Sequence, residues 1–255
     1  MKRQVHYFLT AVLFFTRIPC PSWVDHSPDY INKSSRYFSL VGILIGAISG
    51  LLYWLSTQVF DNDISVLISM ISSVWITGAF HEDGFADVCD GFGGGWTKAK
   101  ILTIMKDSTL GTFGVLGLLF IIALKFLALY KLSTLSTVLP FILIAGHSLS
   151  RFVATLLLYT HPYVRDNDSS KIKPTTKQMS TKALIISGFF GLAPLLLLEN
   201  TLVYLSLFPV LLCYLYLGRL YTKWIGGQTG DCAGALQQVA EVVFYLSLVA
   251  LWKYI

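Results

Sequence analysis

Three aspartates at helical spacing carry the strongest chemical signal in this sequence. Asp83, Asp87 and Asp90 lie at positions i, i+4 and i+7 of the segment 75–91. If the segment is helical, residues three and four apart share one face, so the three carboxylates point the same way. A divalent cation would relieve their repulsion, and Mg²⁺ typically binds through one or two carboxylates plus substrate phosphates. The spacing therefore predicts a Mg²⁺ site formed by these aspartates and the neighbouring Glu82.

A solvated acidic loop end is the alternative interpretation of this segment. Such a loop would scatter its carboxylates and would have little use for Gly84 and Gly91, which permit close backbone approach or a helix end. We therefore favour the metal site. His81 precedes the cluster, and a single histidine in this position is more often a hydrogen-bonding residue than a metal ligand. We take it as a candidate substrate-binding residue.

A second candidate site is the segment 226–231, GGQTGD, which precedes the last apolar stretch. Free N–H groups at a helix N-terminus form a natural anion site. The candidate substrate-binding residues here are Gly226, Gly227, Gln228, Thr229 and Gly230. Asp231 could act in catalysis or merely cap the helix, and the sequence leaves both interpretations open.

Three more charged residues are candidates for work on a polyanionic substrate. Lys106 and Asp107 follow the glycine-rich turn 91–95, which could equally be a plain linker. Arg151 lies inside an apolar stretch, where a charge costs about 2.5–3.5 kcal/mol on insertion scales and needs a partner. An acid of the 83–90 cluster or a substrate phosphate would serve, since arginine suits bidentate phosphate recognition.

The composition places these residues in a membrane protein. The chain of 255 residues is 55% hydrophobic and 13% charged, whereas a soluble domain carries about 25% charged residues. No hydrophilic block approaches the size of a domain, so we predict one membrane-embedded catalytic domain over residues 1–255. The four cysteines show no CxxC spacing and are expected to be free thiols.

Seven apolar stretches are long enough to span a bilayer, which predicts an all-α, polytopic helical membrane protein. They cover approximately 37–60, 64–80, 110–130, 135–159, 183–198, 201–217 and 233–251. The fifth and sixth are short and form a tight helical hairpin around Glu199 and Asn200. The N-terminal charged and apolar run lacks a cleavage pattern, so we predict a retained amphipathic or interfacial helix.

The lysines and arginines support this topology. With the N-terminus in the cytoplasm, 15 of the 19 fall in cytoplasmic segments, two outside and two within helices. The cytoplasmic set is Lys2, Arg3, Arg17, Lys33, Arg36, Lys98, Lys100, Lys106, Arg165, Lys171, Lys173, Lys177, Lys182, Arg219 and Lys223, the external pair is Lys131 and Lys253, and Lys125 and Arg151 lie in helices. Positive residues collect on the cytoplasmic side of short loops. The net charge of +5 therefore needs no nucleic acid, and the segments 81–109, 160–182 and 218–232 face one another in the cytoplasm.

Several blocks of this sequence resemble the signature of the cobalamin synthase (adenosylcobinamide-GDP ribazoletransferase) family. They are GAFHEDGFADVCDG at 78–91, IMKDSTLGTFG at 104–114, GGQTGD at 226–231, FTRIP at 15–19 and the pair Ser150-Arg151. The blocks occur in the family's order and cover nearly the whole chain. Cys89 departs from the residue usual at its position, which leaves the carboxylate pattern intact.

The resemblance implies a Mg²⁺-dependent transferase of the bacterial inner membrane, at the last steps of cobalamin biosynthesis. It would join adenosylcobinamide-GDP and α-ribazole, or α-ribazole 5′-phosphate, and release GMP on the cytoplasmic side. In this hypothesis Asp83, Asp87 and Asp90 hold Mg²⁺, and Asp107 or Asp231 activates the attacking hydroxyl. Arg151, Lys106 and the 226–230 backbone hold phosphate oxygens. The sequence leaves open the preferred ribazole substrate, the number of metal ions and whether the chain forms a homo-oligomer.

Two other functional classes compete with the enzyme. Ionisable residues within a membrane also mark the ion pathways of secondary transporters, so a transporter with an acidic cation site is the main alternative. Transporters often carry related halves with broken helices near the midplane. The absence of a visible repeat and the crowding of acids at one mouth favour an enzyme. A non-catalytic scaffold would leave the acidic cluster unexplained.

Overall fold

The computed structural model describes residues 2–165, 179–252 and 254, and within these ranges the chain is built from helices without strands. Tyr163 and Gln228 form an isolated parallel bridge. The α-helices are α1 (Lys2–Phe15), α2 (Pro28–Ser34), α3 (Phe38–Ser56), α4 (Asn62–Thr77), α5 (Phe80–Gly94), α6 (Lys98–Ile104), α7 (Thr112–Leu135), α8 (Leu139–Thr160), α9 (Thr181–Leu192), α10 (Leu207–Ile225) and α11 (Gly230–Leu251). Short 3₁₀ segments, η1 (Ser35–Tyr37), η2 (Ala193–Leu198) and η3 (Thr201–Ser206), extend α3, α9 and α10.

The predicted spans are present, with one difference. Among the described residues, six helical stretches are long and apolar enough to cross a membrane: Pro28–Ser56, Thr112–Leu135, Leu139–Thr160, Thr181–Leu198, Thr201–Ile225 and Gly230–Leu251. The stretch predicted at 64–80 is α4, which is joined to α5 at a bend of 87°. The pair counts as a seventh, broken span or as a re-entrant segment, so the all-α polytopic prediction is confirmed.

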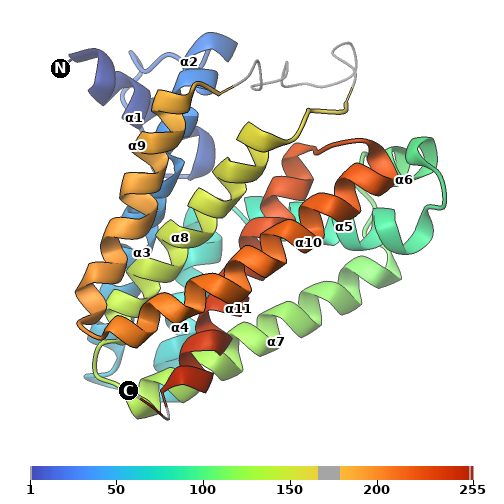
Figure 1. Ribbon diagram of the computed structural model, residues 1–255. Helices are drawn as coiled ribbons and strands as arrows, with labels where there is room; N and C mark the ends of the chain where they lie inside the picture. The colour runs from blue at the N-terminus through green and yellow to red at the C-terminus, as the bar shows by residue number, and fades with distance from the viewer. Residues whose placement is uncertain (1, 166–178, 253, 255) are drawn as a thin grey trace.

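The spans alternate in direction between two ends of the bundle (Figure 1). We call one of them the α5 end; it holds α5, α6, the segment 161–165 and the start of α11. The turns that follow α3, α7 and η2 and the end of α11 lie at the opposite end. The predicted N-terminal helix is present as α1, which packs with α2 at the α5 end. Four of the lysines used for the topology, Lys171, Lys173, Lys177 and Lys253, lie outside the described residues.

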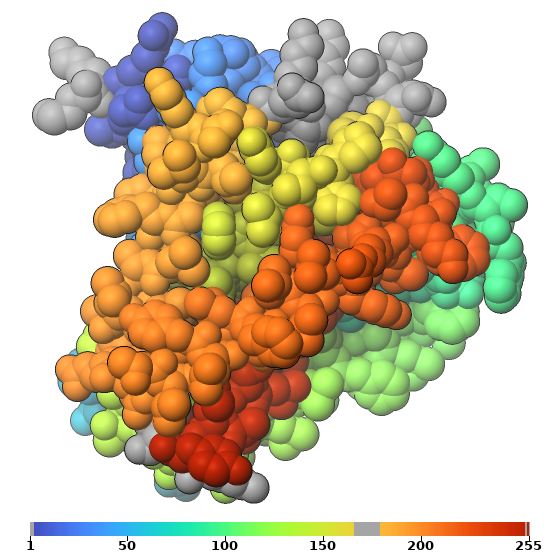
Figure 2. All heavy atoms as spheres, in the orientation of Figure 1, coloured from blue at the N-terminus to red at the C-terminus, as the bar shows by residue number. Residues whose placement is uncertain are grey.

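Helices α3, α8 and α11 form the centre of the bundle. A row of glycines lets α3 approach α8 closely: a Cβ added to Gly42 would lie 2.4 Å from the backbone oxygen of His147, and one on Gly46 would lie 2.6 Å from the Cα of Ile144. Small residues allow such close helix contacts in membranes. This tight centre leaves α9 and α10 on the outside, where they cover the face in Figure 2.

The outer helices expose apolar side chains as a lipid-facing surface requires. Phe208 and Tyr216 on α10 are 65% and 67% exposed, and Leu119 and Phe120 on α7 are each 60% exposed. In water such a surface would be a large apolar patch. Its presence around the spans is consistent with a bilayer as the solvent.

Candidate active site

The turn between α4 and α5 sets the position of the acidic cluster. Gly78 and Ala79 both adopt left-handed backbone conformations, with φ of 65° and 58°. Their N–H groups donate to the carbonyl groups of Trp75 and Val74, which closes the end of α4. The chain then turns through 87°, so α5 runs in a different direction from α4. The prediction that 83–90 is helical is confirmed, since α5 covers all of it.

Helix α5 packs against the start of α11 through a glycine. The position where Gly84 would carry a Cβ lies 3.0 Å from the Cα of Asp231, so the two backbones are nearly in contact. This contact brings the α5 carboxylates to Asp231. Asp87 lies within electrostatic range of Asp231 and Asp83. Three carboxylates, on Asp83, Asp87 and Asp231, therefore share one electrostatic environment.

Arg165 holds Asp231 in place. Its Nη2 donates to Oδ2 of Asp231 in an ion pair and to the backbone oxygen of Met105 at 3.1 Å. The interpretation of Asp231 as a helix cap is wrong, because Thr229 is the N-cap of α11 and accepts from the N–H of Cys232 at 3.2 Å. The carboxylate of Asp231 is thus committed to Arg165 and directed toward the α5 aspartates.

A short backbone pairing carries Arg165 to this position. The N–H of Gln228 donates to the oxygen of Pro162 at 2.8 Å, and the N–H of Val164 donates to the oxygen of Gln228 at 3.0 Å. Gly227 makes the crossing possible, since a Cβ there would lie 2.1 Å from the Pro162 oxygen. The segment 162–165 is thereby fixed beside the predicted 226–231 site.

Most residues of the predicted segment 226–231 stabilise the fold. Gly226 ends α10 with φ of 85°, and Gln228 is fully buried. Gly230 has open space around it, with no atom within 4 Å of an added Cβ. The N-terminus of α11 at Gly230 and Asp231 is therefore the part of the segment that remains accessible to an anion.

Asp90 has a different role from its neighbours. Its two carboxylate oxygens accept hydrogen bonds from the N–H groups of Gly111 at 2.7 Å and Gly114 at 2.8 Å. Gly111 is the N-cap of α7, so Asp90 caps that helix from another element. A carboxylate at a helix N-terminus is favoured by the helix dipole and by the free N–H groups. Asp90 thus fixes α7 to α5, and its role as a metal ligand stays a prediction.

The structure corrects the expectations for Glu82 and His81. Both side chains are buried, with 8% and 2% exposed, on the side of α5 that faces the bundle. Glu82 Oε1 accepts from Nε2 of Gln238 at 3.0 Å, and the ring of His81 stacks on Phe38 at 5.6 Å. Adjacent helical residues point about 100° apart, so Glu82 turns away from the face of Asp83. Neither residue joins the aspartate cluster.

Arg151 is likewise placed in the bundle and away from the cluster. It is 2% exposed, and its Nη1 lies 2.9 Å from the backbone oxygen and 3.2 Å from Nδ1 of His147. Its charge is within electrostatic range of Glu241 and Glu82, but its buried Nε has no hydrogen-bond partner among the described residues. The structure thus places Arg151 in the polar interior of the bundle, and a role in holding a substrate phosphate stays a prediction.

Lys106 and Asp107 lie in the exposed loop between α6 and α7. Asp107 Oδ1 accepts from the N–H of Thr109 at 3.0 Å, and hydrogen bonds from Thr109 lower the pKa of this carboxyl group. Among the described residues, no hydrogen bond or ion pair joins either side chain to Asp83, Asp87 or Asp231. Sequence reasoning missed Arg165, which it counted only as a cytoplasmic charge. The single available signal was its place in the segment 160–182, expected to face the other two.

Asp83 and Asp87 meet one requirement of a divalent-cation site, which is unpaired carboxylates, and miss another, which is a third protein ligand. Among the described residues no hydrogen-bond donor pairs with the carboxylates of Asp83 and Asp87, and Asp87 lies within electrostatic range of Asp83 and Asp231, so a cation would relieve their mutual repulsion. Within the same ranges, no group of three or more His, Cys, Asp and Glu side chains is arranged to hold an ion. Two carboxylates with room for substrate oxygens match the way Mg²⁺ binds with phosphates.

Comparison with known proteins gives a consistent result over almost the whole chain. The family profile described as Cobalamin-5-phosphate synthase matches residues 7–249. A protein named adenosylcobinamide-GDP ribazoletransferase in Shewanella frigidimarina is 45% identical over 249 residues, which cover 97% of this chain and 95% of that protein. Proteins of the same name in Shewanella pealeana and Shewanella oneidensis are 45% and 41% identical, over 98% and 97% of this chain and 97% and 95% of theirs. No solved structure matches the chain.

Proposed function

Because this chain belongs to the cobalamin-5-phosphate synthase family, we propose that its α5 end transfers adenosylcobinamide phosphate from adenosylcobinamide-GDP to α-ribazole or α-ribazole 5′-phosphate. The family and the names of its relatives favour this transferase over the secondary transporter. The observation that carries the proposal is the convergence of Asp83, Asp87 and Asp231 with Arg165 at one end of the bundle.

The proposed reaction exchanges a phosphoanhydride bond of the diphosphate for a phosphoester bond to the ribazole. A ribose hydroxyl oxygen of the ribazole attacks the cobinamide-side phosphorus of the diphosphate, and the bond from that phosphorus to the bridging oxygen breaks. GMP leaves with that oxygen, and the hydroxyl proton passes to a base. Phosphoryl transfer of this kind depends mainly on positioning and charge neutralisation.

We assign the base to Asp231, because it lies beside the α5 carboxylates and Asp107 does not. Arg165 orients Asp231 and supplies positive charge near the diphosphate. The free N–H groups at the start of α11 would bind a phosphate oxygen. Asp83 and Asp87 would hold Mg²⁺, which when bound neutralises negative charge on the diphosphate and the departing GMP.

The proposal also includes the setting of the enzyme. In this proposal the α5 end faces the cytoplasm of a bacterial inner membrane. The cytoplasmic lysines and arginines support this orientation, since they collect near the same end.

Replacing Asp87 with Asn tests the proposal. We expect Mg²⁺-dependent GMP release from adenosylcobinamide-GDP, measured with purified protein in lipid and without any ion gradient, to fall by at least about 100-fold. The fold should be retained, because Asn removes a repulsive charge and no described hydrogen bond. Asp63→Asn, at the opposite end of the bundle, is the matched control and should leave turnover unchanged. Full activity of Asp87→Asn would refute the proposed role of the cluster.

A further inference from the structure

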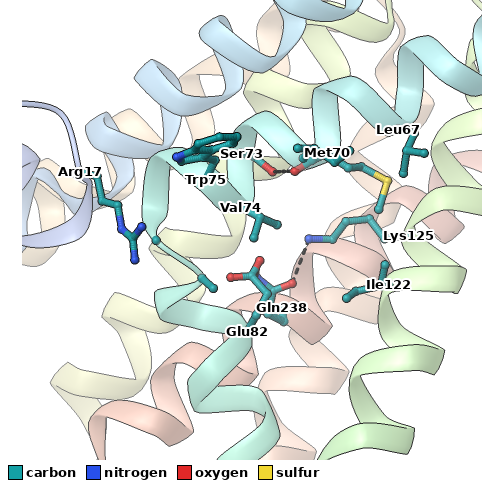
Figure 3. A pocket seen from close by; sticks show the side chains of 13 residues that line it. Arg17, Leu67, Met70, Ser73, Val74, Trp75, Glu82, Ile122, Lys125 and Gln238 are labelled. Atoms are coloured by element: carbon teal, nitrogen blue, oxygen red, sulfur yellow. Dashed lines mark hydrogen bonds between the residues drawn. The ribbon is translucent and has the colours of Figure 1, made fainter.

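A cavity lies on the side of the bundle, away from Asp83, Asp87 and Asp231. It has a volume of about 470 Å³ and is open to the outside between α4 and α7. Residues near the start of α5 and on α11 form its floor (Figure 3). The pocket lies between two apolar helices on the side of the bundle, the surface that a bilayer would cover.

The floor of this side pocket contains an unsatisfied carboxylate oxygen. Glu82 is 8% exposed, and while its Oε1 accepts from Gln238, its Oε2 has no hydrogen-bond partner among the described residues. Lys125 does not fill this role, because its Nζ is committed to Gln238 at 2.9 Å and Glu241 at 3.2 Å. Burying an unpaired charged oxygen is costly, so the geometry calls for a cationic donor from an occupant.

The rim of the side pocket offers a positive charge. Arg17 is fixed by its backbone N–H, which donates to the oxygen of Ile76 at 2.7 Å. Its guanidinium lies over Gly78, where an added Cβ would be 2.4 Å from Nε, and has no acceptor among the described residues. Figure 3 shows Arg17 on the opposite side of Glu82 from Lys125. The pocket thus has an unpaired guanidinium at its rim and a buried, unpartnered carboxylate oxygen at its floor, both at the level of the α4–α5 turn.

The walls of the side pocket continue into the lipid-facing surface. Leu67, Ile71, Trp75 and Ile122 line it and are 42–71% exposed on the outside of the bundle. Leu67 lies about 15 Å along α4 from Thr77, at 1.5 Å per residue, so the apolar wall runs from the turn toward the membrane interior. An occupant with a charged head and a long apolar tail would satisfy both parts.

From these observations we propose that the side pocket binds one phospholipid with a primary ammonium headgroup. Its phosphate would pair with Arg17, its ammonium would donate to Oε2 of Glu82, and an acyl chain would lie along α4 and α7. An anionic glycerol headgroup would leave the Glu82 oxygen without a cation. A quaternary choline headgroup has no N–H to donate. The charge pattern therefore favours the ethanolamine class.

The test is a headgroup series on the wild-type protein. The delipidated protein is titrated with phosphatidylethanolamine, phosphatidylcholine or phosphatidylglycerol of identical acyl chains, and bound lipid is counted by native mass spectrometry. We expect one tightly retained phosphatidylethanolamine, bound about tenfold more tightly than either other lipid. Equal retention of the three lipids, or preference for phosphatidylglycerol, would overturn the proposal without recourse to any variant.

Two substitutions locate the lipid. Glu82→Gln keeps an oxygen for Gln238 but removes the charge, so it should abolish the preference for phosphatidylethanolamine over phosphatidylcholine. Arg17→Gln should weaken the binding of all three lipids. Glu199→Gln and Arg219→Gln change exposed charges elsewhere and serve as controls that should bind as the wild type does. A Glu82→Gln protein that retains the full headgroup preference would show that the lipid lies elsewhere.

Discussion

Four acidic residues within nine positions of α5 have three different environments. Asp83 and Asp87 lie without described donors near Asp231, Asp90 accepts hydrogen bonds from two backbone N–H groups, and Glu82 is buried toward the side pocket. Asp83 and Asp87 are thus the two acidic residues of α5 whose carboxylates accept no described hydrogen bond. This difference separates residues whose loss should affect catalysis from those whose loss should affect folding.

Asp90 should matter for stability. Asp90→Ala leaves the N–H groups of Gly111 and Gly114 without their carboxylate acceptor, and hydrogen bonds to charged groups contribute about 1.5–3 kcal/mol. We expect the free energy of unfolding, measured by denaturant titration in detergent, to fall by about that amount. Asp83→Ala, on the same helix and exposed, should change it by less than about 0.5 kcal/mol. Equal effects of the two substitutions would contradict the capping role.

Arg165 should matter for turnover more than for stability. Its ion pair with Asp231 is partly exposed, with 23% and 21% of the two side chains accessible, so its loss should cost at most about 1 kcal/mol. Arg165→Gln should lower GMP release by roughly 100-fold, because Asp231 loses its orientation and the diphosphate loses a charge. Arg165→Lys should recover part of that loss, since lysine keeps the charge without the planar fork. Arg219→Gln is the control, and an unaffected Arg165→Gln enzyme would exclude this role.

At the scale of helices, the hydrophobic pattern was sufficient to predict most of the architecture. The apolar stretches matched the spans within several residues, and the i, i+4, i+7 spacing of the aspartates correctly predicted that 83–90 is helical. The direction of α5 was not predictable in this way. Hydropathy records how long a stretch is, while the 87° bend depends on two left-handed residues, one of them the non-glycine Ala79.

The candidate site was only partly predictable for a related reason. Asp231 and the α5 aspartates could be recognised as candidates from their local spacing and the neighbouring glycines. The structure brings them together. Arg165 reaches them only because a backbone pairing with Gln228 fixes a segment about 66 residues away in sequence, which no local pattern encodes. The prediction that Glu82 joins the aspartates was wrong because adjacent residues on a helix face different surroundings. The sequence alone does not show which helices pack against each side of α5.

The contact between α5 and α11 should not tolerate a branched side chain at position 84. Gly84→Val places a branched side chain where even a Cβ would lie 3.0 Å from the Cα of Asp231, so the two helices must separate. We expect a loss of about 1–3 kcal/mol in unfolding free energy and a fall in GMP release of roughly 100-fold, because the carboxylates no longer converge. Gly94→Ala, where the nearest atom is 3.5 Å away, is the control on the same helix. Full activity of Gly84→Val would show that the close approach is dispensable.

Across the whole molecule, a buried polar network links the spans behind the candidate site. Glu241 on α11 pairs with Lys125 on α7 at 3.2 Å and His147 on α8 at 3.4 Å, and accepts from Gln237 at 2.6 Å. Gln238 extends the network to Glu82 on α5. Polar groups at membrane depth need internal partners, so these bonds fix how α7, α8 and α11 are arranged. The bundle thereby holds α5 at a constant position relative to Asp231.

This network predicts a strong coupling between Lys125 and Glu241. Lys125→Met leaves Glu241 buried with one cation fewer, and removing one partner of a buried ion pair typically costs about 3–5 kcal/mol. The double variant Lys125→Met with Glu241→Gln removes both charges, so it should be more stable than Lys125→Met alone. Unfolding free energies of the wild type, both single variants and the double variant give the coupling energy, with Lys131→Met on the exposed part of α7 as control. Additive effects of the two substitutions would mean that the pair does not hold α7 to α11, and that helix packing alone positions the site.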